Sequence, residues 1–316
     1  MVCFIIKRLA FSLITIWAVV TITFVLLQFL PGDPFTNDKI VHPQILENLK
    51  EKYRLDAPWH ERYTTYLKGL IKGDLGISMV YRNRSVTSII KRTFPISLNL
   101  GIRAFIIAVF VGLLLGLLSA LYKNKTIDHF TLTISMIGVA VPGFIIGTLF
   151  QYFICYKLSG IIQEFTGTTF RLFPITGWEG FRHTIVPSVS LAFGALGMIA
   201  RMMRESMINT LSQRYIVSAK SKGLKQSEIV LKHALKNAIL PVISLLGPLF
   251  TSIILGSFVI ENIFSIPGMG QHFVTSIKTG DYTMVLGLSI FTSFVVVMIN
   301  TFTDILYTFV DPRVRL

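Results

Sequence analysis

Residues 205–241 read ESMINTLSQRYIVSAKSKGLKQSEIVLKHALKNAILP and form the longest polar stretch in the C-terminal two-thirds of the chain. Strongly apolar segments flank this stretch on both sides. Eight Lys or Arg residues lie between Arg201 and Lys236, and only Glu205 and Glu228 oppose them. Because basic loops between membrane spans stay in the cytoplasm, the stretch predicts a cytoplasmic loop of a membrane protein.

The composition supports a membrane protein as well. Hydrophobic residues make up 52% of the 316 residues and charged residues 15%, and the mean hydropathy is +0.65. These values are typical of a polytopic membrane protein. The net charge of +14 does not indicate a nucleic-acid partner, because the basic residues lie mostly in short loops, where they set topology.

Six segments are apolar over the roughly 20 residues that a helix needs to cross a bilayer. They lie near residues 9–30, 98–121, 131–156, 184–203, 239–260 and 284–310. Each is predicted to be a helix, since lipid offers no water to satisfy an open backbone. The first lacks a small-x-small cleavage site, so we interpret it as an uncleaved span. The basic residues beside the spans place both termini in the cytoplasm.

Residues 31–96 lie outside the cell if the six spans alternate. They carry eleven Lys or Arg and seven Asp or Glu, but their 66 residues exceed the length over which positive charge sets orientation. Turn and start signals predict helices over residues 43–53 and 59–71. A short amphipathic helix through Arg92 follows, which Ser85 is predicted to cap and Pro95 to end, and it is predicted to lie at the membrane surface.

Small residues and prolines interrupt the spans. Glycines one turn apart occur in the second and third spans, at Gly112 and Gly116 and at Gly143 and Gly147. Such pairs let two helices approach closely. Pro142 and the Gly247-Pro248 pair are predicted to bend the third and fifth spans. Packing and flexing during a transport cycle are both open interpretations.

Ionisable side chains inside the spans are scarce. Arg103 lies in the outer half of the second span and Asp304 in the inner half of the sixth. We interpret Arg103 as reaching for the surface and Asp304 as pairing with Lys7 or Arg8. This scarcity disfavours a proton- or ion-driven carrier, although backbone carbonyls can also bind Na⁺.

Enzyme signatures are missing from the sequence. There is no G-x-x-x-x-G-K-[ST] phosphate cradle, so the chain is not expected to hydrolyse ATP. Ser257 and His272 suggest an intramembrane serine protease only weakly, because neither lies in a protease motif. Cys3 and Cys155 are too far apart for a disulfide framework or a zinc site, and we interpret both as unpaired thiols.

Apolar residues recur at helical spacing on both sides of Gly223 in the polar stretch. They are Met207, Leu211 and Tyr215 before the glycine, and Leu224, Leu231 and Leu235 after it. Gly223 is predicted to take the left-handed conformation that ends a helix. Ser218, Ala219 and Ser221 form a surface of small side chains that another protein can approach closely. A docking surface and an ordinary helical hairpin on lipid headgroups both fit this pattern.

The sequence YIVSAKSKGL…LKHALKNAILPV resembles the EAA loop of ABC-importer permeases of the oligopeptide, dipeptide and nickel family. Its eponymous Glu is absent here, which leaves any role of that carboxylate in doubt. In this family the loop docks in a groove of a cytoplasmic ATPase. The resemblance therefore assigns ATPase coupling to Val217, Ser218, Ala219, Lys222, Gly223, Leu224 and Pro241.

Other blocks extend the resemblance over the whole chain. They are RLAFSL…FLPGDPF, KGLIKGDLGIS, FPIS, VIENIFSIPGMGQ and the terminal DPRVR, in the order of the family. These details are most similar to the OppB branch of oligopeptide importers, with dipeptide, nickel and metallophore permeases as near relatives. Residues near the outer end of the fifth span are then expected to gate the pathway or to contact a binding protein: Pro267, Gly268, Gly270 and Gln271.

The resemblance implies an all-α membrane protein with six transmembrane helices and the type I ABC importer permease fold. Residues 1–316 would form one permease domain in a bacterial inner membrane, with residues 31–96 outside and residues 205–238 as the cytoplasmic coupling loop. Such a chain is non-catalytic and has no cofactor or metal of its own.

The implied partners complete an importer. They are an OppC-like permease, two ATPase subunits that bind ATP and Mg, an extracytoplasmic peptide-binding protein, the peptide cargo and membrane lipid, with no nucleic acid. The alternatives are a dipeptide, nickel or metallophore permease, or an autonomous secondary carrier or channel. A carrier would move its substrate when reconstituted alone, whereas a permease subunit would not.

Overall fold

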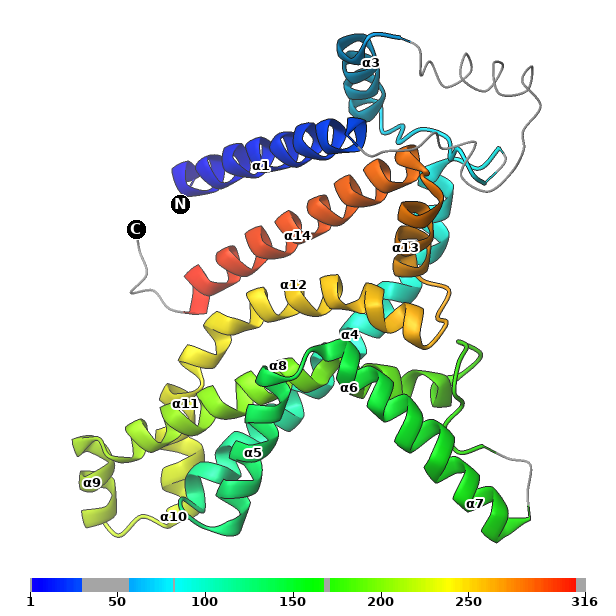
Figure 1. Cartoon of the computed structure of the whole chain (residues 1–316). Coiled ribbons are helices and arrows are strands. Elements are labelled where there is room, and N and C mark those ends of the chain that lie inside the picture. The colour runs from blue at the N-terminus through cyan, green and yellow to red at the C-terminus, as the bar shows by residue number, and fades with distance from the viewer. Residues whose placement is uncertain (1, 30–56, 82, 168–170, 311–316) are drawn as a thin grey trace. The chain divides into compact units, whose positions relative to one another are not determined.

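The computed structural model describes residues 2–29, 57–81, 83–167 and 171–310, with the backbone alone at residues 2–5, 9, 28 and 304–310. The described chain is helical, with one isolated β-bridge between Ile77 and Ser85 (Figure 1). Its helices are α1 (Val2–Gln28), α3 (Trp59–Ile71), α4 (Val86–Leu121), α5 (Thr126–Ala140), α6 (Gly143–Phe150), π-helix η1 (Gln151–Leu158), α7 (Ser159–Thr166), α8 (Phe181–Leu211), α9 (Arg214–Ser221), α10 (Gln226–Glu228), π-helix η2 (Ile229–Ala234), α11 (Leu235–Ala238), α12 (Leu240–Ile263), α13 (Met269–Thr279) and α14 (Tyr282–Val310).

Six helical stretches in the described part of the chain are long and apolar enough to cross a membrane, as predicted. They are α1, α4, Gly143–Thr166, α8, α12 and α14. The third span differs from the expected 131–156, because the helix breaks at Val141 and Pro142 between α5 and α6. Proline lacks an N–H and its ring clashes with the preceding turn, which is the reason for the predicted bend. In contrast, α12 continues through Pro248.

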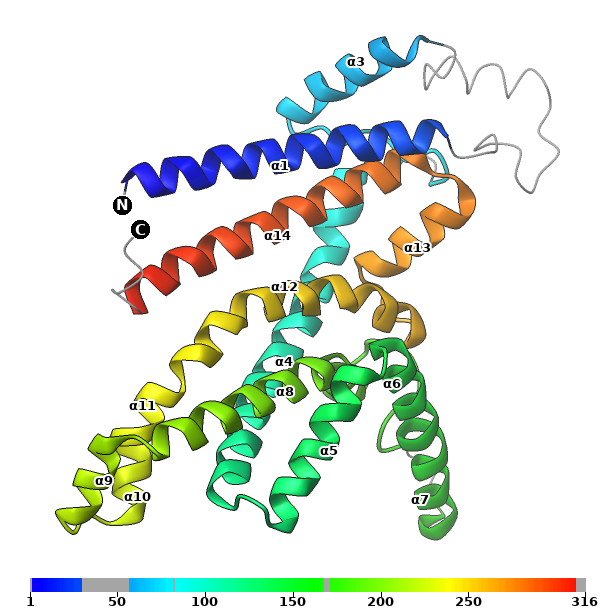
Figure 2. The ribbon, with the colours of Figure 1, turned by 60° about the vertical axis from the view of Figure 1, so that its left-hand side comes forward.

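The contacts divide the chain into two compact units, residues 1–96 with 268–301 and residues 97–267 with 302–316. In the first unit, α1 and α14 run antiparallel side by side (Figures 1 and 2). Phe24 and Leu27 of α1 pack with Val285 and Leu286 of α14. Helix α3 joins this cluster through tyrosines, and the hydroxyls of Thr21 and Tyr63 lie 2.6 Å apart.

The described segment between α1 and α4 follows the sequence predictions in part. Helix α3 has the predicted bounds, 59–71, while the expected helix over residues 43–53 lies outside the described residues. Ser85 caps α4, since its Oγ accepts the N–H of Ser88 at 3.2 Å. The prediction that Pro95 ends this helix is wrong, because α4 continues to Leu121. Buried side chains on both sides of the proline, such as Ile90 and Leu100, offset the lost backbone hydrogen bond.

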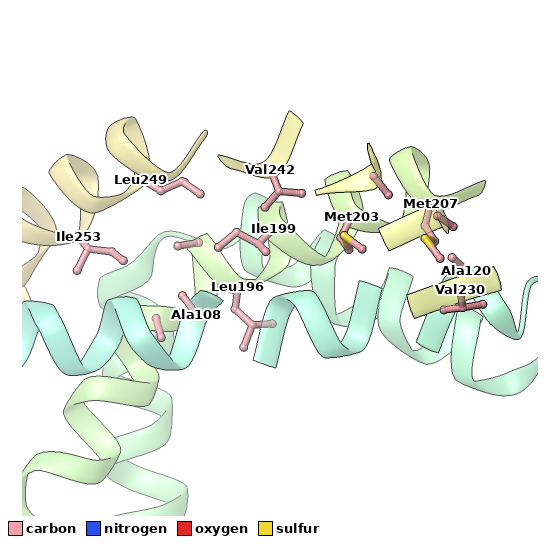
Figure 3. Close-up of a cluster of buried hydrophobic side chains, with 14 of the residues drawn as sticks. Ala108, Ala120, Leu196, Ile199, Met203, Met207, Val230, Val242, Leu249 and Ile253 are labelled. Carbon is pink, nitrogen blue, oxygen red and sulfur yellow. The ribbon is translucent and has the colours of Figure 1, made fainter. Parts of the chain in front are cut away.

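The second unit has one apolar core, in which α8 is central. Helix α8 makes its most extensive contacts with α5 and α12. Ile199, Met203 and Met207 of α8 are fully buried among side chains of α4, α12 and η2, as Figure 3 shows. Because a helix is buried on most sides only inside a bundle, α8 serves as the axis of this unit.

Glycines bring α4 against α8. A Cβ added at Gly112 would lie 2.9 Å from Ile199 Cβ, and one added at Gly116 would lie 2.5 Å from the carbonyl oxygen of Ala200. The predicted close approach is thereby confirmed for this pair. The second pair is divided: Gly147 is in tight contact with Ile260 of α12, whereas Gly143 has open space around it.

We expect Gly116→Ala to destabilise the protein by about 1–3 kcal/mol, because the added methyl group would force α4 away from α8. Thermal unfolding of the purified protein in detergent measures this effect. Gly160→Ala in α7 is the matched control, since a Cβ there meets nothing within 4 Å. Equal unfolding temperatures for the two variants would contradict the packing described here.

Candidate functional site

The polar stretch after α8 forms a helical hairpin that turns at Gly223, as predicted. Helix α9 ends there with two backbone hydrogen bonds: Gly223 N–H to the Lys220 carbonyl at 2.9 Å, and Leu224 N–H to the Ala219 carbonyl at 3.4 Å. This pair of bonds is a Schellman motif, which requires a left-handed residue, and Gly223 has φ of +76°. Elements α9, α10 and α11 lie together at one end of α8 (Figure 2).

The hairpin is fused to the core of the second unit. Ile216 of α9 and Val230 of η2 are buried with Met203 and Met207 of α8. The side chain of Asn237 also donates to the hydroxyl oxygen of Tyr215 at 2.8 Å, which joins α11 to α9. A force on the hairpin therefore acts on α8 through packed side chains rather than through a flexible linker.

The assigned coupling residues divide between the surface and the core. Ser218, Lys222, Gly223 and Pro241 are exposed, as is Val217 at 56% exposure. Leu224 is half-buried, and Ala219 is buried at 8% exposure within the core of its own unit. Of the three small side chains expected at the surface, Ala219 therefore faces inward.

The apolar residues that recur after Gly223 are buried to different degrees. Leu224 and Leu235 are half-buried, whereas Leu231 is 61% exposed. Ile229, Val230 and Ala234, all in the π-helix η2, are buried. The helical spacing of the three leucines therefore does not mark the buried face of this segment.

An ion pair that the sequence did not reveal lies beside the hairpin. Asp128 of α5 accepts from Arg204 of α8 at both oxygens, Nε to Oδ1 at 2.6 Å and Nη2 to Oδ2 at 2.8 Å. Ser119 Oγ, at 2.5 Å, and Asn124 N–H, at 2.8 Å, donate to the same carboxylate. The Asp128 side chain is 1% exposed and that of Arg204 is 16% exposed.

These donors hold the pKa of Asp128 well below its usual value, with Arg204 contributing most, although burial acts in the opposite direction. The network joins α4, α5 and α8 at the end of α8 that carries the hairpin. Both charges fall just outside the predicted spans 131–156 and 184–203, so neither is a charge inside a predicted span. A lone carboxylate in an otherwise basic region was the available signal.

A cavity of about 310 Å³ lies in the second unit, lined by residues of α5, α6, α8 and α12 and of the break between α5 and α6. Its lining has no charged side chain, and its polar side chains are Ser190 and Ser252. Four glycines open the space: Gly138, Gly143, Gly194 and Gly256. The same α8 that is fused to the hairpin forms one wall of this cavity.

The outer residues expected to act as a gate lie where α13 begins. Gly268 precedes α13 and is buried together with Gly270, whereas Pro267 and Gln271 are exposed.

Buried Asp281, in the first unit, was not expected from the sequence. Its carboxylate accepts hydrogen bonds from the hydroxyl of Ser78 and from the N–H groups of Met79 and Met284, with each N–H donor at 3.1 Å. Asp281 therefore holds the GDLGIS block against the start of α14.

The other residues named as candidates from the sequence are hydrogen-bonded, buried or outside the described side chains. Arg103 Nη1 donates to Thr184 Oγ1 at 2.6 Å, and its guanidinium lies over the Phe181 ring. Ser257 Oγ donates to the Ile254 carbonyl. Cys155 is a free, buried thiol. The side chains of Asp304 and Cys3 lie outside those that the structure describes. Among the described residues, no three His, Cys, Asp or Glu side chains gather as a metal site requires.

Comparison with known proteins covers the full chain. Residues 112–316 match the family described as "Binding-protein-dependent transport system inner membrane component", and residues 1–101 match its N-terminal counterpart. The dipeptide transport system permease protein DppB of Bacillus subtilis is 40% identical, over 99% of this chain and 98% of that protein. The oligopeptide transport system permease protein OppB of Haemophilus influenzae is 39% identical over 100% of both.

A solved structure shares the fold. A chain of the MetNI methionine ABC transporter, in an inward facing conformation, superposes with a TM-score of 0.52 at 17% identity. The match covers 71% of this chain and 97% of that one. The matched part of this chain therefore has the same helical fold as that chain of the MetNI transporter.

Asp128→Asn is expected to cost about 3–5 kcal/mol of stability, because it leaves the largely buried Arg204 charge without its partner. The double variant Asp128→Asn with Arg204→Gln should be less unstable than Asp128→Asn alone. Thermal unfolding of the three proteins measures the difference. Glu228→Gln, which removes an exposed ion pair with Lys232, is the control and should cost at most about 1 kcal/mol.

The pH dependence of this pair follows from the lowered pKa of Asp128. A carboxylate with a depressed folded-state pKa stabilises the fold above its unfolded pKa of about 3.9, and this contribution is lost as pH falls through the lower folded value. The stability gap between wild type and Asp128→Asn should therefore persist from neutral pH to about pH 4 and shrink below it. A gap that closes near pH 6 would contradict this account.

Proposed function

The chain belongs to the binding-protein-dependent transport system inner membrane components, and from this premise we propose that it is the OppB-like half of an oligopeptide importer. Family membership makes it a non-catalytic, multi-pass permease subunit of a peptide ABC importer of the inner membrane, in which partner subunits hydrolyse ATP. The full-length similarity to two peptide permeases is the observation that carries the proposal.

The proposed assembly is a heterodimer of this chain with an OppC-like permease, above two cytoplasmic ATPases, with a peptide-binding protein outside. The type I importer fold, with both termini in the cytoplasm, agrees with the basic residues beside the spans. Residues 1–316 form a single permease domain in this proposal, with residues 31–96 outside and residues 205–238 as the coupling loop.

The hairpin α9–α11 is the proposed contact with an ATPase. Its exposed face carries Val217, Leu231 and Tyr215 among several lysines, so it offers apolar area with a basic rim. The Schellman turn fixes the angle between α9 and α10. Closure of the ATPases on ATP would then displace a preformed unit rather than order a flexible one.

Movement would pass from the hairpin to the cavity along α8. Ile216 and Val230 pack on α8 at one end, and Ser190 and Gly194 of α8 line the cavity at the other. The Asp128–Arg204 pair keeps α5, another wall of the cavity, in register with α8. We propose that this cavity is part of the peptide pathway, since a wall without charges tolerates cargo of varied charge.

Dipeptide import is the second candidate function, because the dipeptide permease of B. subtilis is as similar to this chain as the oligopeptide permease is. Uptake of labelled peptides of two to five residues by the reconstituted transporter separates the two. We expect uptake of the longer peptides. Uptake of dipeptides alone would favour the second candidate, and no uptake of any peptide would overturn both.

Gly223→Leu is expected to abolish ATP-driven uptake while the protein still inserts into the membrane. Space is available at this position, since nothing lies within 4 Å of an added Cβ, so the cost is the left-handed backbone, roughly 1–2 kcal/mol for most residues. Gly223→Asn is the matched control, because Asn tolerates this conformation, and it should retain most of the uptake. Peptide-stimulated ATPase activity and uptake in proteoliposomes measure coupling. Full uptake by Gly223→Leu would refute the docking role of this turn.

A further inference from the structure

A second cavity, of about 210 Å³, lies in the first unit between the start of α4 and α13. It is lined by Arg84, Ser88, Ile89, Arg92, Thr93 and His272. Ser88 and Arg92 lie four residues apart in α4, which puts their side chains on one side of that helix, and Arg84 lies in the segment just before it. Five of the six lining side chains carry a hydrogen-bond donor, and none carries a negative charge.

The arginine and histidine side chains in this cavity have donors to spare, whereas the hydroxyls of Ser88 and Thr93 already donate to the carbonyls of Ser85 and Ile89, at 2.7 and 2.9 Å. Arg84 and Arg92 are exposed, and neither forms an ion pair with a carboxylate in the described part of the chain. The Nδ1 atom of His272 is buried without a hydrogen-bond partner among the described residues, while the Tyr81 ring packs edge-on against the imidazole at 5.4 Å. A buried polar atom without a partner is costly, so a bound group that satisfied it would be stabilised.

The electrostatics of the cavity favour a negative charge. The pKa of His272 lies below its usual value, because burial disfavours the charged imidazolium and the positive charge of Arg84 adds to this effect. The carboxylate of Asp281 in the same unit is already occupied by Ser78, Met79 and Met284. Two guanidinium groups therefore meet at the cavity without a counter-charge from its lining.

We propose that this cavity binds the terminal carboxylate of a peptide on the outer side of the membrane, an inference that rests on the proposed import of peptides. Every linear peptide with an unmodified C-terminus carries this group, whatever its side chains are. Guanidinium groups bind a carboxylate through paired, charge-assisted hydrogen bonds. At about 210 Å³ the cavity is smaller than the roughly 300–1,000 Å³ pockets that enclose whole ligands, which suits one end of a peptide.

Protection of the two arginines from chemical modification tests the site directly. The assembled transporter, in nanodiscs and without its binding protein, is treated with phenylglyoxal, and the modification of each arginine is quantified by mass spectrometry. Trialanine should slow the modification of Arg84 and Arg92 about tenfold, whereas trialanine amide should not, because it lacks the carboxylate. Exposed Arg171, which lies outside the cavity, is the internal reference and should react equally in both cases.

A pair of variants links the cavity to transport. Ser88→Asp places a carboxylate inside the cavity, so it should abolish the protection by trialanine and raise the KM for peptide uptake about tenfold without a matching fall in kcat. Asn83→Asp adds the same charge at an exposed residue outside the cavity lining and should change the KM far less.

Other outcomes overturn the proposal. Protection by trialanine amide as strong as by trialanine would exclude carboxylate recognition. Protection that needs phosphatidylglycerol in the nanodisc but no peptide would assign the cavity to a lipid, and protection by unloaded binding protein would assign it to a protein contact.

The same experiments separate this site from the proposed function. If wild type imports peptides while trialanine gives no protection, this site is excluded and the proposed function stands. If wild type imports no peptide, the proposed function itself fails.

Discussion

The close contact of α8 with its neighbours is the constraint on which the second unit depends. In a membrane, lipid tails are as apolar as leucine, so helices associate through tight packing and polar contacts rather than through the hydrophobic effect. Here Gly112 and Gly116 let α4 reach the backbone of α8. Gly138 and Gly197 do the same between α5 and α8, where an added Cβ would lie 2.8 Å and 3.0 Å from a carbonyl oxygen. The hairpin α9–α11 and the cavity of the second unit are placed by these contacts.

Buried carboxylates hold elements in position within each unit. In the second unit, the buried Asp128–Arg204 pair fixes α5 against α8. In the first unit, Asp281 holds the GDLGIS block against the start of α14. Each carboxylate is buried, and each is satisfied by several donors, which is the condition for keeping such a group away from water.

The hairpin α9–α11 combines an angle fixed by its backbone with a buried inner face. Gly223 sets the turn through its left-handed conformation. Ile229, Val230 and Ala234 of η2 are buried and anchor the hairpin, whereas Leu231 and Val217 are exposed. A hairpin that is both anchored and exposed is suited to the proposed transmission of a displacement, because its inner side moves with α8.

The sequence alone determined the features that depend on local chemistry. Span number follows from the length of apolar runs, the break at Pro142 from a missing N–H, the bounds of α3 from turn signals, and the turn at Gly223 from the one residue without a Cβ. The tertiary structure decided the rest. Pro95 remains inside α4 because buried side chains on both sides stabilise the helix, and Ala219 faces inward because of the packing of α9. The partnership of Asp128 with Arg204 joins residues 76 positions apart, and only the packing of α5 on α8 brings these two charges together.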